Sequence, residues 1–254
     1  MREFLDVTKQ PAGTPTLVAA IFDWWNGAVA KHGVAAAFRQ FLRLLWEFAR
    51  DSAPSRQRQR YGDVDYDWDY RVDTTGATVG WRDRLLGVFH SPYQPTDPTL
   101  FREMMQALEI DFSEFTFIDI GSGKGRVLLM AANYPFRRIV GIELLPQLHR
   151  IAQGNIRKYK SESQQCFAIE AVCGDAREFA FPPEPTVLYL FNPLPEAGLM
   201  QLLGNLERSL RDHPRPMYVL YHNPLLEQVL TSQKCLHKFG GTHQYSLFKT
   251  TPQQ

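Results

Sequence analysis

A short loop rich in glycine contains the residues with the clearest chemical potential. Asp119–Gly125, with the sequence DIGSGKG, follows the apolar run Phe115–Ile120 and precedes a helical pattern. Gly121 permits a sharp turn, and Gly123 lets a ligand approach the backbone, because neither residue has a Cβ atom. Gly125 allows the following helix to pack closely on the strand. A strand, a glycine turn and a helix in this order favour a ligand-binding turn.

Polar residues follow three further apolar runs. Glu143 lies 22 residues after Gly121, a spacing at which a carboxylate can accept both ribose hydroxyls of a bound nucleoside. Asp175 follows the next run and could accept a hydrogen bond from an adenine amino group, or serve as a turn or helix-cap residue. Asn192 precedes Pro193 at the end of another run. That pair either directs the asparagine amide into a cleft or simply stops the strand.

Strands and helices alternate through the second half of the chain. The predicted strands are Phe115–Ile120, Arg138–Glu143, Phe167–Val172, Thr186–Phe191 and Met217–His222. Four helical patterns alternate with these strands. The first begins at Asp97 and Pro98, and the others cover Lys124–Asn133, Pro146–Tyr159 and Leu199–Leu210. This rhythm predicts an α/β fold, a Rossmann-like doubly wound and mostly parallel sheet with helices on both faces. Ligands bind such sheets beyond the carboxyl ends of the strands, near the point where the strand order reverses.

The end of the chain breaks the alternation. Two strand-like runs, Cys235–Phe239 and His243–Lys249, are separated by Gly240, Gly241 and Thr242. A tight glycine turn between two strands predicts a hairpin. The last strand must then run antiparallel to its neighbour, which completes a sheet of seven strands.

Residues 1–92 are predicted to form a helical and irregular extension to a domain that spans residues 93–254. In this extension, Val34–Arg50 places apolar residues on one helical stripe, with its arginines mostly off that stripe. We predict that this helix packs on the second half of the chain. The alternative is a cationic amphipathic helix that lies on a membrane surface.

The acidic and aromatic stretch Tyr61–Tyr70 has aspartates at every second position from Asp63 to Asp69. Alternation at period two is typical of a strand. Aspartate is a poor strand former, so a surface loop with its aromatic side chains turned inward is equally compatible. A calcium-binding EF-hand is not indicated, because Trp68 and Thr74 stand where that loop needs Gly and Glu.

Composition and charge exclude several classes of protein. The chain has 254 residues, of which 44% are hydrophobic and 22% charged, as in ordinary globular proteins. Lys plus Arg is 28 and Asp plus Glu is 27, so the net charge is +1 and no nucleic-acid partner is expected. The three cysteines are spaced too widely for a disulfide framework or a zinc site, and no metal is expected. Reduced thiols, a polar Met1–Pro15 and no transmembrane window favour a cytoplasmic protein.

Taken together, these features resemble the class I, seven-strand S-adenosylmethionine-dependent methyltransferases. The resemblance covers about residues 93–250. The segment FIDIGSGKGRVLLMAA is similar to non-SET lysine methyltransferases that modify nucleosomes and to mitochondrial lysine methyltransferases of the same fold. Tyr93-Gln94-Pro95-Thr96 looks like the Tyr-x-x-Thr loop that those enzymes fold over the methionine end of the cofactor. The whole chain resembles an uncharacterised bacterial methyltransferase family, whose pattern Val72–Gly76 also matches.

The resemblance implies S-adenosyl-L-methionine as the cofactor and a role for each matching residue. Asp119 would position the cofactor's ammonium, Glu143 would hold its ribose, and Asp175 with the backbone of Ala176 would meet its adenine. The methionine portion would be lined by Tyr93, Thr96, Gly121, Ser122, Gly123 and Gly125. Asn192 falls in the motif after the fourth strand, which is often Asn/Asp-Pro-Pro-aromatic in enzymes that methylate amino groups. Here the motif lacks its second proline and its aromatic residue, which argues against an adenine or glutamine-amide substrate.

The predicted activity is N-methylation of an amine on a protein or a small molecule. Asn192 would orient the amine through its side-chain oxygen and could also contact the cofactor, while Tyr221 and His222 are either candidate bases or packed strand ends. Alternatives are O-methylation of a small molecule and a non-catalytic cofactor-binding or scaffold protein of the same fold. A nicotinamide oxidoreductase is a further alternative, against which Arg126 and the terminal hairpin argue.

Overall fold

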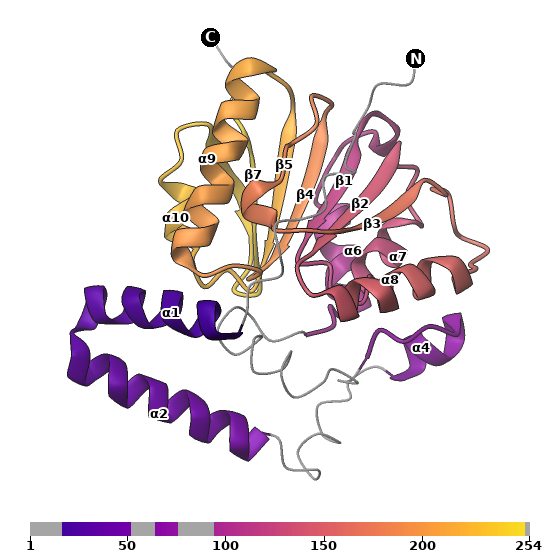
Figure 1. The fold of residues 1–254 in the computed structure, drawn as a ribbon. Coiled ribbons are helices and arrows are strands. Elements are labelled where there is room, and N and C mark those ends of the chain that lie inside the picture. The colour runs from indigo at the N-terminus through magenta and orange to yellow at the C-terminus, as the bar shows by residue number, and fades with distance from the viewer. Residues whose placement is uncertain (1–16, 52–63, 76–93, 252–254) are drawn as a thin grey trace.

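The computed structural model describes residues 17–51, 64–75 and 94–251, which form a mostly parallel sheet flanked by helices (Figure 1). The strands are β1 (Thr116–Ile120), β2 (Arg138–Glu143), β3 (Ile169–Cys173), β4 (Thr186–Phe191), β5 (Met217–His222), β6 (Leu236–Gly241) and β7 (Tyr245–Thr250). Their order across the sheet is β3-β2-β1-β4-β5-β7-β6. Only the pairings of β7 with β5 and β6 are antiparallel within the described sheet. The predicted fold class and closing hairpin are therefore confirmed.

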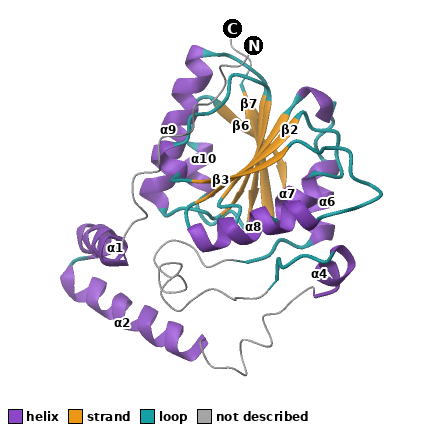
Figure 2. Cartoon of the chain, turned by 45° about the vertical axis from the view of Figure 1, so that its right-hand side comes forward, coloured by secondary structure: helices purple, strands orange, loops and turns teal. Residues whose placement is uncertain are grey.

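Helices cover both faces of this sheet, as a doubly wound fold requires (Figure 2). One face carries α6 (Pro98–Gln106), α7 (Arg126–Ala131) and α8 (Pro146–Lys158), and the other carries α9 (Glu196–Asp212) and α10 (Glu227–Thr231). Two short 3-10 helices, η1 (Phe112–Glu114) and η2 (Ala176–Glu178), lie in connections. Asp97 caps α6 by accepting hydrogen bonds from the backbone of Thr99 and Leu100, and Pro98 occupies the first turn. This helix start agrees with the sequence prediction.

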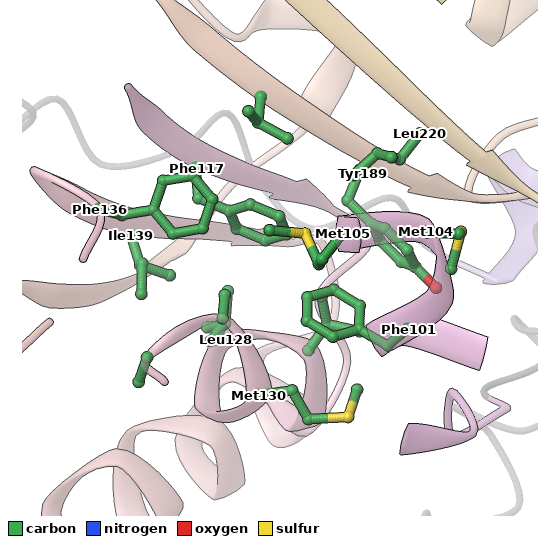
Figure 3. Packing of buried hydrophobic residues seen from close by; sticks show 14 of the residues in the cluster. Phe101, Met104, Met105, Phe117, Leu128, Met130, Phe136, Ile139, Tyr189 and Leu220 are labelled. Carbon is green, nitrogen blue, oxygen red and sulfur yellow. The ribbon is translucent and has the colours of Figure 1, made fainter. Parts of the chain in front are cut away.

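Two apolar layers hold the helices on the sheet. On one face, the rings of Phe101 from α6, Phe117 from β1 and Tyr189 from β4 meet at centroid distances of 6.0 to 6.4 Å (Figure 3). On the other face, five leucines of α9 (Leu199, Leu202, Leu203, Leu206 and Leu210) are buried against β1, β4 and β5. Burial of large apolar side chains on both faces is the main favourable term in folding.

The strand order reverses at β1, which lies between β2 and β4. Parallel pairing places Ile120 beside Ile142 on one side and beside Leu190 on the other. The carboxyl ends of these three strands therefore share one edge, where the glycine loop and the segment after β4 emerge. A crevice at such a switch point is where open α/β sheets bind ligands.

The amino-terminal helices differ from their predicted arrangement. Helix α2 (Val34–Asp51) forms a hairpin with α1 (Leu17–His32), and the ring of Phe41 lies 6.0 Å from that of Trp24. Ala37 is buried, whereas Phe38 and Leu42 on the same predicted stripe are about half exposed. Among the described residues, α2 thus packs mainly on α1. The prediction that it packs on the second half of the chain is wrong. Contact of residues 34–50 with a membrane surface stays an untested alternative.

The acidic and aromatic stretch is also a correction. Val64–Tyr70 is helix α4, neither a strand nor a loop, and residues 61–63 lie outside the described residues. A helix brings residues four apart onto one face, and the rings of Tyr66 and Tyr70 indeed meet at 4.7 Å. Asp65 and Asp67 in the first turn interact favourably with the helix dipole. The same residues that alternate with period two also include a pair four apart, and the helix uses that spacing to bring Tyr66 and Tyr70 together.

Gly141 of β2 provides a test of how tightly the site's edge is packed. A Cβ atom at this position would lie 2.6 Å from Leu128 Cδ1 and 2.7 Å from Ser122 Oγ. We expect Gly141→Ala to lower the free energy of unfolding by about 1–3 kcal/mol through overpacking. Gly204→Ala in α9 is the matched control, because its Cβ would meet nothing within 4 Å and helix propensity favours alanine by roughly 1 kcal/mol. Denaturant unfolding measures both, and an equal response of the two variants would contradict the packing argument.

Candidate functional site

The glycine loop after β1 makes the sharp turn that its residues predict. Gly121, Gly123 and Gly125 have φ values of 78°, 55° and 84°, a region that favours glycine. A Cβ atom on Gly121 would lie 2.8 Å from the Cβ atom of Pro193, so only glycine lets the loops after β1 and β4 meet. A Cβ atom on Gly125 would lie 3.2 Å from that of Ala152 in α8. The third glycine thus admits a neighbouring helix, whereas the sequence suggested close packing on the strand.

Glu143 is the last residue of β2, and its carboxylate contacts this loop while leaving some of its acceptor positions open. Its side chain is buried, and its two oxygens accept the backbone N–H groups of Gly123 at 2.7 Å and Leu145 at 2.8 Å. Burial raises the pKa of Glu143, and these N–H groups act in the opposite direction. A carboxylate has about four acceptor positions. After two backbone bonds, it can therefore still accept two hydroxyl groups.

Asp119 is a buried carboxyl group with an unsatisfied oxygen in the described part of the structure. Its side chain is 2% exposed, and its Oδ2 atom has no hydrogen-bond partner among the described residues. Burial, followed by the charge of Glu143, raises the pKa of Asp119 well above its usual value. An unpartnered buried carboxyl group costs free energy, and a cationic ligand group beside it would reverse the pKa shift. Asp119 is thus suited to an ammonium ion.

Ser122, Asp175 and Ala176 lie around the same edge of the sheet. The Oγ atom of Ser122 is buried and has no hydrogen-bond partner among the described residues. Asp175 caps η2 through the backbone N–H of Arg177 and pairs with the Arg177 guanidinium at 2.5 Å. Ala176 is buried in the first position of that 3-10 helix. Asp175 therefore has a structural role in this state, and the adenine contact stays a prediction.

A buried chain of hydrogen bonds connects Thr96 to the end of β5. Thr96 Oγ1 lies 2.8 Å from Tyr189 Oη, which lies 2.8 Å from His222 Nδ1. The His222 ring stacks on Phe191 at a centroid distance of 3.8 Å. Burial lowers the pKa of His222 from 6.5 to about 4, although the charge of Asp97 opposes the shift. These hydrogen bonds hold Thr96 in place. Tyr93, which was predicted to line the methionine portion together with Thr96, lies outside the described residues.

Asn192 and Asn223 form a second polar cluster at the ends of β4 and β5. Their φ values are 43° and 48°, and each precedes a proline. Asn192 Nδ2 donates to the carbonyl of Asn223 at 2.5 Å, and Asn192 Oδ1 accepts the hydroxyl of Tyr221 at 2.7 Å. These two bonds fix which end of the amide is the oxygen. Non-glycine residues held at positive φ are uncommon and gather at functional sites.

Sequence reasoning missed two residues of this edge. Tyr189 carried a weak signal, as a phenol between the aliphatic residues Leu188 and Leu190. Asn223 carried a stronger one, because the tripeptide Asn-Pro-Leu occurs after β4 at residues 192–194 and again after β5 at residues 223–225. The repeat marks two adjacent strand ends with the same backbone turn.

The described residues hold no cluster of three or more His, Cys, Asp or Glu side chains that could bind a metal ion. Within the described part of the chain, no helix has both the length and the apolar character needed to cross a membrane.

Comparisons with known proteins agree with this geometry. Residues 90–172 match the model of a family described as histone methylation protein DOT1, which is about a third of the chain. A curated protein-lysine N-methyltransferase from Saccharolobus islandicus (strain REY15A) is 31% identical over 70 residues. That match covers 27% of this chain and 43% of the relative, so the chain spans less than half of the relative's length.

Solved structures with related folds include an RNA methyltransferase from Salinibacter ruber in complex with S-adenosyl-L-homocysteine. It is 22% identical, covers 63% of this chain and 95% of its own, and has a TM-score of 0.42. The putative methyltransferase yhhF from Escherichia coli is 16% identical over 62% of this chain and 89% of its own, with a TM-score of 0.45. The strand order and the antiparallel β7 are those of the class I methyltransferase fold, and the family match falls on the part of that fold from residue 90 to residue 172.

The buried His222 predicts a specific loss of stability in acid. Below about pH 6.5 an unfolded chain binds a proton that the folded protein does not take up until about pH 4, so this residue destabilises the fold as the pH falls through that window. We expect His222→Gln to remove a loss on the order of 2 kcal/mol between about pH 7 and about pH 4.5. Denaturant unfolding at both pH values measures the difference. The exposed His243→Gln should leave the loss as in wild type, and an unchanged acid loss in His222→Gln would refute the assignment.

Proposed function

We propose that this protein is an S-adenosylmethionine-dependent methyltransferase that transfers a methyl group to an amine, with a lysine side chain of a protein as the favoured acceptor. The observation that carries the proposal is the buried Oδ2 atom of Asp119, which has no hydrogen-bond partner among the described residues, beside a glycine loop and a second buried carboxyl group, that of Glu143. This pair suits a ligand with a cationic amine at one end and adjacent hydroxyl groups further along. S-adenosylmethionine has both.

The chain's residues fit that cofactor group by group. Asp119 would hold the ammonium of the methionine portion, next to the exposed backbone of Gly121. Glu143 would accept the ribose hydroxyls with the acceptor positions that Gly123 and Leu145 leave open. Asp175 and Ala176 would border the adenine, and Thr96 would close the methionine end. When bound, the cofactor supplies a methyl group made electrophilic by its sulfonium.

Asn192 would orient the acceptor amine. Its Oδ1 atom already accepts the Tyr221 hydroxyl, but an amide oxygen has a second acceptor position. With a neighbouring backbone carbonyl, that oxygen could hold the two hydrogens of an amine and direct its lone pair toward the methyl group. Correct positioning of two reacting groups can supply several kcal/mol, on the order of 7–11 in the best cases.

The lysine ammonium must lose a proton before it can react, and the site favours loss to solvent. His222 has a pKa of about 4 because it is buried, so it would hold an abstracted proton too weakly at neutral pH. Burial raises the pKa of Tyr221, which keeps its hydroxyl protonated and donating to Asn192. Both residues therefore serve better as positioning groups than as bases.

A protein substrate is supported by the family description and by the name of the archaeal relative. The structure adds an ion pair at 2.9 Å between Lys31 of α1 and Glu196, the first residue of α9. Glu196 lies four residues after Asn192. We propose that residues 1–92 select the acceptor from this side, and that residues 93–254 form the catalytic domain.

Cofactor binding is the first test. In Glu143→Gln, an amide N–H would face the backbone N–H of Gly123 or Leu145, and an acceptor for the ribose is lost. A lost hydrogen bond to a charged group is worth about 1.5–3 kcal/mol, so we expect roughly ten- to hundredfold weaker binding of S-adenosylhomocysteine. Calorimetric titration measures this, with NAD as the control ligand. Glu184→Gln, which alters a carboxylate just before β4 at the opposite end of that strand, should bind as wild type does. Equal affinities for all three proteins would reject the cofactor site.

Methyl transfer is the second test, with methyl-labelled cofactor and cell extract as the source of acceptors. We expect Asn192→Gly to lower turnover about a hundredfold, as loss of a preorganised polar group at a reacting centre does. Glycine adopts positive φ without steric cost, so the substitution does not strain the turn. Tyr221→Phe should lower turnover by less, about tenfold, because it only frees the amide to rotate.

Both variants should bind S-adenosylhomocysteine normally, which separates acceptor positioning from cofactor binding. Label recovered in alkali-stable methyl-lysine supports the proposed acceptor. Label in an alkali-labile ester, or turnover by Asn192→Gly equal to that of wild type, counts against it.

A further inference from the structure

A fully buried lysine stands in the middle of the glycine loop. Lys124 lies between Gly123 and Gly125, and its side chain is 0% exposed. Its Nζ atom donates to Asp73 Oδ1 at 2.5 Å and to the carbonyl of Thr75 at 2.9 Å. An ammonium removed from water needs such partners, because an unpaired buried charge is strongly destabilising. The loop is therefore tied to a segment 50 residues away in sequence. We call Val64–Thr75 the acidic segment.

The acidic segment is shaped for this contact by its own aspartate. The carboxylate of Asp67 in α4 accepts the backbone N–H groups of Thr74 and Thr75, each at 2.7 Å. It also accepts the hydroxyl groups of both threonines. This set of bonds holds the turn after α4 so that the Thr75 carbonyl and the Asp73 carboxylate face Lys124.

Asn155 of α8 joins the same two elements through their backbones. It is 2% exposed; its Oδ1 atom accepts the N–H of Asp73 at 2.9 Å, and its Nδ2 atom donates to the carbonyl of Asp73 at 2.8 Å and to that of Lys124 at 2.9 Å. One side chain thus uses both ends of its amide to hold the acidic segment against the glycine loop.

Aromatic contacts extend the junction beyond the loop. The Arg126 guanidinium lies over the ring of Tyr66 at 4.5 Å, and the ring of Tyr70 packs on that of Tyr159 at 5.2 Å. Figure 1 shows α4 beside α8, on the helical layer that also contains α7. Polar and aromatic contacts together fix the acidic segment to the start of α7 and the end of α8.

We infer that the acidic segment is a positioning element of the cofactor site, acting through the Asp73–Lys124 pair on the backbone of the glycine loop. The inference rests on the proposed function. Glu143 holds the front of the loop through the Gly123 N–H, but this same carboxylate must also engage the ribose. Asp73 and Asn155 bind Lys124, the residue after Gly123, and the proposed site gives neither of them a contact with the cofactor. They keep the loop's shape independent of what Glu143 binds.

This arrangement couples two sites in energy. A cofactor that requires the ordered loop also favours the docked acidic segment, and by linkage the docked segment raises the affinity for cofactor. Asp73 and Lys124 are positioning residues, since neither would touch the ligand. Their removal should therefore weaken cofactor binding even where the fold survives.

The experiment compares affinity with stability in the full-length protein. Asp73→Asn leaves a buried ammonium with weaker partners, so we expect lower thermal stability and about tenfold weaker binding of S-adenosylhomocysteine. The double variant Asp73→Asn/Lys124→Met removes the buried charge as well. Lys124 is the buried member of the pair, whereas the Asp73 side chain is 51% exposed. Because an apolar side chain then replaces the buried charge, the double variant should regain the melting temperature but not the affinity. Hydrogen exchange of the peptide Gly121–Val127 should be faster than in wild type.

A control variant neutralises a partly exposed ion pair that lies away from the site. Arg138 and Glu184 pair at 3.3 Å, near the amino-terminal ends of β2 and β4, and Arg138→Met/Glu184→Gln should bind as wild type does. If the Asp73 and Lys124 double variant melts and binds as wild type does, the pair has no positioning role and the inference is overturned. If wild type fails to bind S-adenosylhomocysteine at all, the proposed function fails too. Normal binding by wild type, with loss in Glu143→Gln alone, removes only the present inference.

Discussion

The candidate site depends on a glycine loop held between two carboxylates. Glu143 binds the loop's backbone from the ligand side, and Asp73 binds the buried ammonium of Lys124 from behind. Three glycines at positive φ give the loop its shape, but such residues cost conformational entropy and supply no side chains to hold that shape. The ordering must come from neighbours, and the two carboxylates with Asn155 provide it.

The sheet and its ligand edge could be predicted because they follow from short-range patterns. Apolar runs at strand length, separated by helical patterns, determine a doubly wound sheet, and parallel strands bring their carboxyl ends to one edge. Asp119, Glu143 and Asn192 come together for that reason alone. The terminal hairpin was equally local, since two neighbouring strand-like runs define it. The predicted turn was displaced, because Gly240 and Gly241 belong to β6 and the turn lies at residues 242–244.

Features that depend on distant contacts could not be predicted in the same way. The helix α4 is stabilised by Tyr70 on Tyr159 and by Asp67 on the turn at Thr74, and no window around residue 65 contains the first of these partners. Gly125 was predicted to let its own helix pack on the strand. Its close neighbour is Ala152 of α8, which lies too far along the sequence for a local pattern to indicate the contact. No residue near Lys124 in the sequence indicates that its side chain is buried, because its partners Asp73 and Thr75 lie about 50 residues away.

The two halves of the edge differ in how far the protein satisfies its own polar groups. Around Asn192 each amide end already has a partner, so the acceptor side is organised before any substrate arrives. Around Asp119 a buried carboxyl oxygen has no partner among the described residues. Burial, followed by the charge of Glu143, raises the pKa of Asp119. A cationic ligand would repay that cost, and ligands that bind only the folded state stabilise it. The fold thus contains an unfavourably buried carboxyl group where the cofactor is proposed to bind. Where the acceptor is proposed to react, the polar groups are already hydrogen-bonded in a fixed arrangement.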